Sequence, residues 1–143
     1  MTKVFVPMDS AALSMGANEV AQAISEQAIK NGLDVTVVRN GSRGMLWLEP
    51  LVEVETPSGR VGYANVSAEQ IPDLITAGLF TGSSHNSCLG LVEELDYLKN
   101  QTRITFARVG VTDPLSLADY EAHGGLKGLR NAIATSPEKI VRR

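Results

Sequence analysis

The fold is decided by the stretch Val35-Thr-Val-Val-Arg39-Asn-Gly-Ser-Arg43-Gly-Met-Leu-Trp-Leu-Glu-Pro50. Its first four residues are β-branched, which favours a buried strand, and a polar loop that contains glycine follows them. In α/β proteins, the loops at the carboxyl ends of strands hold the functional sites. We therefore expect this loop, with Arg39 and Arg43, to mark the candidate site.

A strand–helix–strand unit leads into this stretch. Lys3 to Val6 predicts a short buried strand, and Asn31-Gly32 is a typical helix end because glycine adopts the left-handed cap conformation without a steric penalty. Between them, apolar residues recur at helical spacing: Ala17, Val20, Ala21, Ile24 and Ala28. This order predicts a βαβ unit with a right-handed crossover.

A strand–strand–helix unit follows. Leu51 to Glu55 alternates apolar and acidic residues, Thr56 to Gly59 predicts a tight turn, and Arg60 to Val66 predicts the returning strand. Ser67-Ala-Glu-Gln70 then reads as a capping box at a helix start, but Pro72 would break a regular helix that began at Ser67, so a start at Pro72 is the alternative. The order β-α-β and then β-β-α predicts an α/β fold of the thioredoxin-like kind, a central sheet with helices on both faces.

The second half of the chain differs in composition. Gly78 to Gly90 is rich in Gly, Ser and Asn and is predicted to be a linker. Leu91 to Leu98 predicts a short helix, and Asp113-Pro114 predicts the N-cap and first residue of another. We divide the chain into a thioredoxin-like domain, residues 1–82, and a linker with a mostly helical C-terminal extension, residues 83–143.

The end of the sequence resembles the start of a helix rather than its completion. Ser136-Pro137 predicts a helix start, and Arg143 follows before Ile140 and Val141 have found apolar partners. We therefore expect the chain to be a piece of a larger protein.

The composition is that of a globular protein with an acidic balance. Hydrophobic residues make up 43% and charged residues 20% of the 143 residues, and the net charge is −3. This charge gives no basic footprint for nucleic acid or for an anionic membrane. The single cysteine, Cys88, fits a reducing compartment. The residues from Met1 to Pro7 do not have the layout of a signal peptide. We therefore expect a cytoplasmic protein without a membrane segment.

Candidate metal and phosphate motifs are incomplete. The segment His85-Asn-Ser-Cys88 has a possible ligand spacing, but the sequence offers no second His or Cys pair to complete a tetrahedral site. Gly124-Gly-Leu-Lys-Gly128 could present amides to an anion, but it lacks the phosphate-loop pattern and is interpreted as a turn. We predict no metal site.

Catalytic motifs are equally weak. The carboxylate pairs Glu53/Glu55 and Glu93/Glu94 are interpreted as solvated faces. No histidine accompanies a candidate nucleophile in a readable motif, and no Cys-x-x-Cys is present for the thioredoxin reaction. The sequence predicts a domain without catalytic residues.

The pattern Arg39-Asn-Gly-Ser-Arg43-Gly…Glu49-Pro50 carries a family resemblance. Residues 1–82 resemble the thioredoxin-like 2Fe–2S subunit of NADH:ubiquinone oxidoreductase and its fused relatives, in which two cysteine pairs hold the cluster. With Met15-Gly16-Ala17 as the anchor, the resemblance places the first pair at Pro7 and Ala12 and the second at Arg39 and Arg43. Such a cluster needs four thiolates. The resemblance therefore implies a degenerate domain that binds no cofactor.

A second resemblance covers the stretch from Leu98 through Thr112-Asp-Pro to His123-Gly-Gly125. It is similar to the lead-in to the NADH- and flavin-binding region of beta subunits of NAD-dependent formate dehydrogenases, which are oxidoreductases. This implies a non-catalytic region that contacts alpha and gamma subunits. It also implies FMN, NAD and 4Fe–4S sites in residues beyond Arg143. The diaphorase subunit of NAD-reducing hydrogenases, or a related NADH dehydrogenase, shares the fusion and stays an alternative.

Two further hypotheses concern the same loop. Arg39 and Arg43 could form an anion or nucleotide pocket, since guanidinium groups bind phosphate and carboxylate; otherwise they pair with Asp9 or face solvent. The run Met45 to Leu48, which includes Trp47, is a candidate apolar patch for self-association.

Overall fold

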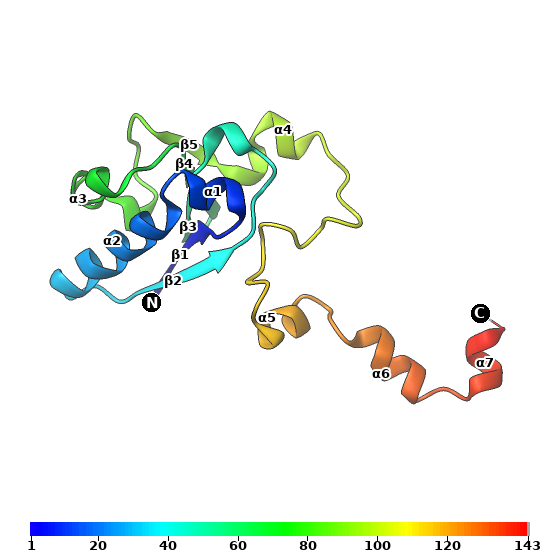
Figure 1. Ribbon diagram of the computed structural model, residues 1–143. Coiled ribbons are helices and arrows are strands. Elements are labelled where there is room, and N and C mark those ends of the chain that lie inside the picture. The colour runs from blue at the N-terminus through cyan, green and yellow to red at the C-terminus, as the bar shows by residue number, and fades with distance from the viewer. Residues whose placement is uncertain (143) are drawn as a thin grey trace.

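The computed structural model describes residues 1–142 as a sheet domain followed by an arm of short helices (Figure 1). The strands are β1 (Thr2–Pro7), β2 (Val35–Asn40), β3 (Val52–Thr56), β4 (Gly59–Tyr63) and β5 (Cys88–Leu91). The α-helices are α1 (Ser10–Ser14), α2 (Ala17–Lys30), α3 (Ile71–Thr76), α4 (Asp96–Lys99), α5 (Leu117–Ala122), α6 (Lys127–Ile133) and α7 (Pro137–Val141). The 3₁₀ turns are η1 (Leu46–Leu48), η2 (Ala68–Gln70), η3 (Leu79–Thr81) and η4 (Val92–Glu94).

The strands form one sheet in the order β2-β1-β3-β4-β5. β1 pairs with β2 in parallel, from Thr2 opposite Val35 to Pro7 opposite Asn40, and the other pairs are antiparallel. A parallel pair needs a long crossover, which α2 provides. The predicted βαβ unit is confirmed, and its register brings the loops after β1 and β2 to the same end of the sheet.

The predicted ββα unit is also present. β3 and β4 form a hairpin in which Thr56 lies opposite Gly59, and the Thr56 hydroxyl donates to the Gly59 carbonyl at 2.7 Å. The capping box forms, with the Ser67 amide donating to the Gln70 side chain at 3.0 Å. A short 3₁₀ turn comes first, and the regular helix α3 starts only where Pro72 occupies its first turn, a position that does not require a backbone donor.

The helices α1, α2 and α3 cover the first face of the sheet. Val20 and Ile24 of α2 are 1% and 0% exposed and pack against alternate side chains of β1, β3 and β4. The helix ends at Lys30, and Gly32, two positions later, has a φ of +62°, the left-handed conformation predicted for this position. The apolar stripe read from the sequence is therefore the face that α2 buries.

The second face of the sheet is covered differently. Gly62 lies between Val61 and Tyr63, whose side chains belong to the apolar core on the first face. Because successive residues of a strand point to opposite faces, a side chain at position 62 would point to the second face, where an added Cβ would lie 2.8 Å from Val92. A second apolar cluster fills this side, formed by Met45, Leu51, Val92 and Leu98. The expected helices on this face are reduced to turns, the short α4 and the segment around Gly110.

The segment expected to be a linker contributes an edge strand. β5 pairs with β4, placing Leu91 opposite Val61 and Cys88 opposite Tyr63, with an irregularity beside Gly62. Glycine at position 62 lets the chain beyond β5 approach the sheet closely, because a side chain there would collide with Val92. Local composition signals the bends of this segment correctly, but pairing with β4 is a long-range contact that composition does not report.

The arm consists of α5, α6 and α7 and extends away from the sheet domain (Figure 1). These three helices contain no buried residue within the described chain. The predicted N-cap at Asp113 is wrong, because α5 begins three positions later and Ser116 caps it by accepting from the Asp119 amide at 3.1 Å. Among residues 1–142, no helix has the length and apolar character needed to cross a membrane.

Candidate functional site

The candidate site lies where β1 and β2 end, and we call it the strand-end site: residues 7–12, 39–44, Glu49 and Glu53. The Met8 amide donates to the Asn40 carbonyl at 2.9 Å and holds the two loops together. Of the positions singled out by the family resemblance, Pro7 ends β1, Ala12 is buried in α1, Arg39 lies in β2 and Arg43 lies in the loop after it.

Arg43 is 3% exposed and forms the centre of the strand-end site. Its Nε and Nη2 donate to the two carboxylate oxygens of Glu53 at 2.8 and 2.7 Å, a bidentate pair, and its Nη1 donates to Glu93 at 2.8 Å. Burial acts to lower the pKa of Arg43, but the hydrogen bonds and charges of Glu53 and Glu93 outweigh it and raise the pKa. The guanidinium is therefore held charged inside the protein.

Glu53 faces the second side of the sheet and is 0% exposed. The interpretation of Glu53 as part of a solvated face is wrong. The alternation of β3 predicts that Glu53 and Glu55 lie opposite Val52 and Val54, but it does not show that another segment covers the acidic face. Glu55 is exposed, because that cover does not extend over it.

Arg60 of β4 is the second cation on Glu53. Its guanidinium stacks 3.3 Å from the centre of the Phe5 ring and lies 3.5 Å from a Glu53 oxygen. It also donates to the carbonyls of Val111 at 2.8 Å and Gly110 at 3.4 Å. Burial is the main cause of its lowered pKa, with Arg43 adding repulsion. Arg60 thus connects the sheet to the start of the arm.

Asn40 makes the second connection to this segment. Its side-chain amide donates to the Gly110 carbonyl at 2.7 Å. Gly110 has φ +76°, and an added Cβ would lie 2.6 Å from Cδ of Arg43 and 3.0 Å from the Ser42 carbonyl oxygen. Only glycine fits at this crossing. We call the set Asn40, Arg43, Glu53, Arg60 and Glu93, together with the Gly110 backbone, the Arg43 network.

Arg39 does not join this network. Its Nε and Nη2 donate to the Val6 and Pro7 carbonyls, both at 3.1 Å, and Nη2 also donates to Asn18 of α2 at 3.0 Å. Burial lowers the pKa of Arg39. The two arginines contact different elements, so these contacts give no support to a joint anion pocket, which stays a prediction.

The expected arginine partner Asp9 has another role. Its carboxylate accepts from the Ala11 and Ala12 amides at 3.0 and 3.3 Å and caps α1. The arginines instead find partners in Glu53, Glu93 and Asn18. Sequence spacing did not indicate these pairs, because they join residues ten to fifty positions apart.

Glu49 is a buried carboxylate that the sequence did not single out. It is 2% exposed and accepts from the Ser42 hydroxyl at 3.0 Å and from the Leu51 amide at 2.9 Å. Burial raises the pKa of Glu49, and the nearby charges of Asp9 and Glu53 raise it further. The strand-end site therefore holds one carboxyl group that is costly to ionise.

The donor set does not fit a 2Fe–2S cluster. Pro7 and Ala12 have no ligand atom in their side chains, and Arg39 and Arg43 are donors of hydrogen bonds rather than thiolates. The single cysteine, Cys88, is on β5, at the opposite edge of the sheet from β2. Among residues 1–142 no group of three or more His, Cys, Asp or Glu side chains could hold a metal ion. A cluster that needs four thiolates has one available.

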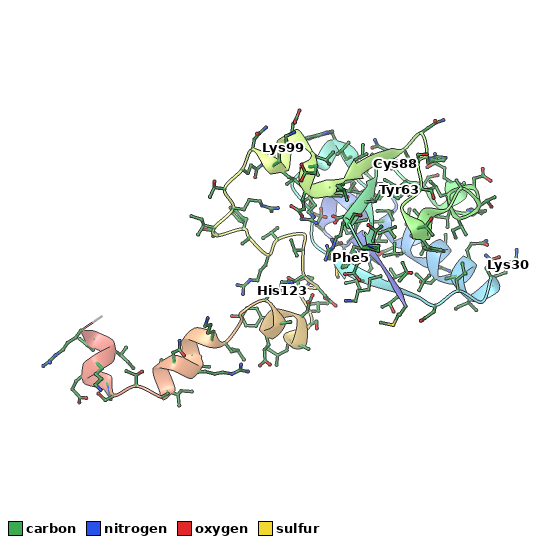
Figure 2. The ribbon with its side chains drawn as sticks, turned by 180° about the vertical axis from the view of Figure 1, so that it is seen from behind. Phe5, Lys30, Tyr63, Cys88, Lys99 and His123 are labelled. Atoms are coloured by element: carbon green, nitrogen blue, oxygen red, sulfur yellow. The ribbon has the colours of Figure 1, made fainter. Side chains whose placement is uncertain are left out.

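The other sequence candidates serve local structure. His85 contacts the Ser87 hydroxyl at 2.8 Å and accepts from the Ser87 amide. Cys88 lies beside Tyr63 on the neighbouring strand (Figure 2), and burial, followed by the charge of Cys88, raises the pKa of Tyr63 to about 12. In the glycine-rich turn, the Gly125 amide donates to the Tyr120 carbonyl at 2.8 Å.

The candidate apolar patch is only partly exposed. Leu46 and Trp47 are 57% and 61% exposed, whereas Met45 is buried in the second cluster. The Trp47 ring meets the ring of Tyr97 edge to face, with 5.3 Å between their centres.

No family model matches the sequence, and the comparison with curated proteins found no match. Solved structures of the thioredoxin-like [2Fe-2S] ferredoxin from Aquifex aeolicus are similar. A cysteine-to-serine variant of that protein aligns with a TM-score of 0.54 at 20% identity over 63% of this chain and 99% of that chain. The wild-type ferredoxin aligns with a TM-score of 0.52 at 20% identity over 63% of this chain and 97% of its own. At this identity the similarity establishes the fold, and the predicted thioredoxin-like class is confirmed.

Proposed function

We propose that this chain is the cluster-free N-terminal region of the beta subunit of an NAD-dependent formate dehydrogenase. The holoenzyme would oxidise formate to CO₂ and reduce NAD⁺. This region would carry no electrons and would make contacts with the alpha and gamma subunits. The proposal is supported by the thioredoxin-like fold and by the resemblance of residues 98–125 to the lead-in to a flavin domain.

The observation that carries the proposal is the state of Arg43. The family resemblance assigns a thiolate to this position, and the guanidinium there makes three hydrogen bonds to Glu53 and Glu93. A buried arginine with all these donors used is a structural element, because removing either partner would leave a buried charge unpaired. This favours a scaffold role over electron transfer.

The Arg43 network also supports a positioning role for this region. Asn40 and Arg60 bind the backbone carbonyls of Gly110 and Val111, and these bonds fix the point at which the arm leaves the sheet domain. In the proposed subunit, this network would set the direction in which the chain enters the flavin domain. The chain's own residues would hold position and move no proton or electron.

Two measurements test the proposal. The chain is incubated with ferrous iron, sulfide and dithiothreitol and then reduced; we expect no visible charge-transfer band and no electron paramagnetic resonance signal of a 2Fe–2S cluster. The chain is also titrated calorimetrically with the alpha–gamma subassembly of a formate dehydrogenase from the same genome, and we expect binding. A reconstituted cluster would disprove the scaffold role, and failure to bind would disprove the assignment to formate dehydrogenase.

The alternative parent is the diaphorase subunit of an NAD-reducing hydrogenase, or a related NADH dehydrogenase. It predicts the same spectroscopic result but a different partner. Titration with the corresponding hydrogenase subunits is therefore the matched control. Binding there, with none to the formate dehydrogenase subassembly, would replace the first assignment with the second.

A further inference from the structure

The two edges of the sheet are built differently. β5 forms one edge: it is four residues long, its pairing with β4 is irregular between Gly62 and Tyr63, and Gly90 within it has a φ of +78°. Short length, irregular pairing and glycine are features with which proteins keep an edge strand from pairing with another chain. The β5 edge is therefore protected against further pairing.

β2 forms the other edge and has none of these features (Figure 1). It is six residues long, pairs with β1 in a regular parallel register, and begins with four residues of high strand propensity, Val35-Thr-Val-Val38. Its one charged residue, Arg39, directs its guanidinium back onto the Val6 and Pro7 carbonyls. A regular edge strand of this composition is open to pairing with another strand.

The bonds between β2 and β1 show which backbone groups of β2 face away from the sheet. The Thr2 amide donates to the Asp34 carbonyl at 2.9 Å. The Met8 amide donates to the Asn40 carbonyl, also at 2.9 Å. Because alternate residues of a strand direct their backbone groups to the same side, the even-numbered residues from 34 to 40 face β1. The odd-numbered residues direct theirs outward, and these are Val35, Val37 and Arg39.

These outward groups have almost no partners in the described chain. The Val35 amide donates to the Leu33 carbonyl at 3.1 Å. Within residues 1–142, the amides of Val37 and Arg39 and the carbonyls of all three outward residues make no hydrogen bond. A row of unpaired donors and acceptors along an edge strand is a template for one more strand.

An exposed apolar side chain lies beside the same edge. Asn18 of α2 accepts from Arg39 of β2 at 3.0 Å, so the side of α2 that carries Asn18 faces β2. Ile29 follows Asn18 by eleven positions, which is about three helical turns, so it lies on that side as well. Ile29 is 80% exposed, and Leu33, just before the strand, is 42% exposed. Apolar groups beside an open edge favour a polypeptide partner.

We propose that β2 pairs antiparallel with β2 of a second copy of this chain, about a twofold axis at Val37. In this register each Val37 amide donates to the Val37 carbonyl of the other copy. Each Arg39 amide donates to the Val35 carbonyl of the other copy, so outward donors meet outward acceptors. On the second face Thr36 lies opposite Val38, and β-branched cross-strand pairs of this kind stabilise a sheet. The contact does not depend on which enzyme the chain belongs to.

A second copy is favoured because β2 is complementary to itself. A twofold contact places the same strand on both sides and closes the assembly as a dimer. Pairing of β2 with β5 of another copy would leave a free β2 at one end and extend into a filament, and the short, irregular β5 disfavours it. The charge of Arg39 comes to lie opposite Val35 of the other copy, so no like charges face each other across the contact.

The oligomeric state is the first test. In sedimentation velocity over a concentration series, the chain should change from a monomer to a species of twice its 15.3 kDa mass. A chain that stays monomeric at the highest concentration would overturn the proposal. An open-ended series of larger species would overturn it as well, because a twofold contact through β2 closes at two copies.

Amide hydrogen exchange measured by NMR identifies the edge. The amides of Thr36 and Val38 face β1 and should be protected at every concentration. Those of Val37 and Arg39 should exchange rapidly in the monomer and about tenfold more slowly when about nine in ten copies are paired, because exchange then requires dissociation. A dimer in which the Val37 amide exchanges as in the monomer would place the interface elsewhere, such as the run Met45 to Leu48, and would overturn the proposal.

A proline variant tests the outward amide of Val37. Val37→Pro removes this donor, whereas the bonds to β1 come from the even-numbered residues, so the variant should fold and its dimer dissociation constant should rise about tenfold or more. The matched control is Val37→Ala, which keeps the amide and should weaken the dimer much less. A folded Val37→Pro that associates like the wild type would contradict the register. Circular dichroism checks folding, and if the variant does not fold, the exchange of the wild-type amides decides alone.

Discussion

In the sheet domain, α2 places Ile24 fully inside the first face, whereas in the arm α6 leaves Ile133 77% exposed. Both isoleucines recur at helical spacing with other apolar residues, so the local pattern treats them alike. The sheet gives α2 a surface to cover, and the described structure gives α6 none. The difference shows that an apolar stripe indicates which face of a helix must be buried. It does not indicate which other part of the structure buries that face.

Charges follow the same division. The sheet domain buries Arg43 and Glu53 as a bidentate pair, whereas the arm keeps Arg130 and Glu121 as an exposed pair at 3.0 Å. A buried pair is costly to break because the remaining charge has no solvent, and an exposed pair contributes little. The predictions that follow test this contrast between body and arm.

The largest expected effect is that of Arg43→Met. It leaves Glu53 buried with only the longer contact to Arg60, and we expect a loss of about 3–5 kcal/mol in the free energy of unfolding. Chemical denaturation measures it. The control is Arg130→Met in the arm, which should cost less than about 1 kcal/mol because its pair is exposed. Equal costs would show that the buried pair does not distinguish the two regions.

The second comparison is Ile24→Ala against Ile133→Ala. The first creates a cavity in the core and should destabilise the protein by about 2–5 kcal/mol, whereas the second removes exposed methylene groups and should change stability by less than about 0.5 kcal/mol. Both are measured in the monomer at low concentration, so that any contact between copies is absent. A large effect of Ile133→Ala there would mean that the arm packs on its own body.

A smaller effect is expected where the two regions join. Gly110→Ala should strain the left-handed backbone and collide with Arg43, whereas Gly90→Ala has nearly the same φ, +78°, and nothing within 4 Å. We expect about 1 kcal/mol for Gly90→Ala from strain alone and about 1–3 kcal/mol more for Gly110→Ala.

Amide hydrogen exchange locates the effect of Gly110→Ala. Residues around 110–119 should exchange faster while β1 and α2 stay protected, because the variant separates the arm from the Arg43 network without opening the core. Faster exchange in β1 as well would mean that the arm junction supports the whole sheet.

The smallest effect concerns two glutamates, Glu49 and Glu138, whose pKa values are shifted in opposite directions. Burial raises the pKa of Glu49, whereas hydrogen bonds from its own amide and from Ser136 lower the pKa of Glu138 in the arm. Carbon-13 NMR titration of the carboxyl groups should place Glu49 above and Glu138 below the ordinary value of about 4.3. The reverse order would contradict the burial of Glu49.

The raised pKa of Glu49 also has a consequence for stability. Between its unfolded and folded pKa values the folded state binds more protons, so stability falls as the pH rises. The contribution is complete below about pH 4.3 and is lost as the pH passes the folded pKa. Unfolding free energies measured from pH 4 upward should therefore fall more steeply in the wild type than in Glu49→Gln.

Much of the fold could be predicted from the sequence. Helix α2 with its end at Gly32, the hairpin at Thr56–Gly59 and the capping box at Ser67 all depend on contacts within a few residues, and all three are confirmed. The order of these elements gave the thioredoxin-like class. Strand β5 could not be predicted, because a short strand among Gly, Ser and Asn depends on pairing with β4.

The site was harder to predict than the fold. The sequence pointed to the loop that contains Arg43. It did not indicate that Glu53, Glu93 and the backbone at Gly110 surround the Arg43 side chain. Because Glu53 is charged, its side chain was expected to face solvent. It is buried only because the chain crosses the second face of the sheet and covers it. Glu49 belongs to the pattern that carries the family resemblance, but nothing in the sequence indicated that its carboxylate is buried, because that burial comes from the turn into Leu51.

The sequence by itself determined the local elements, their order and the lack of cysteine at four positions of the strand-end site. Those properties follow from spacing and side-chain chemistry over a few residues. The tertiary structure alone decided that Arg43 is a buried structural cation while Arg39 caps the end of the βαβ unit through Val6 and Pro7. The two arginines are only four positions apart in sequence, but their burial and their partners depend on which distant segments fold over each of them.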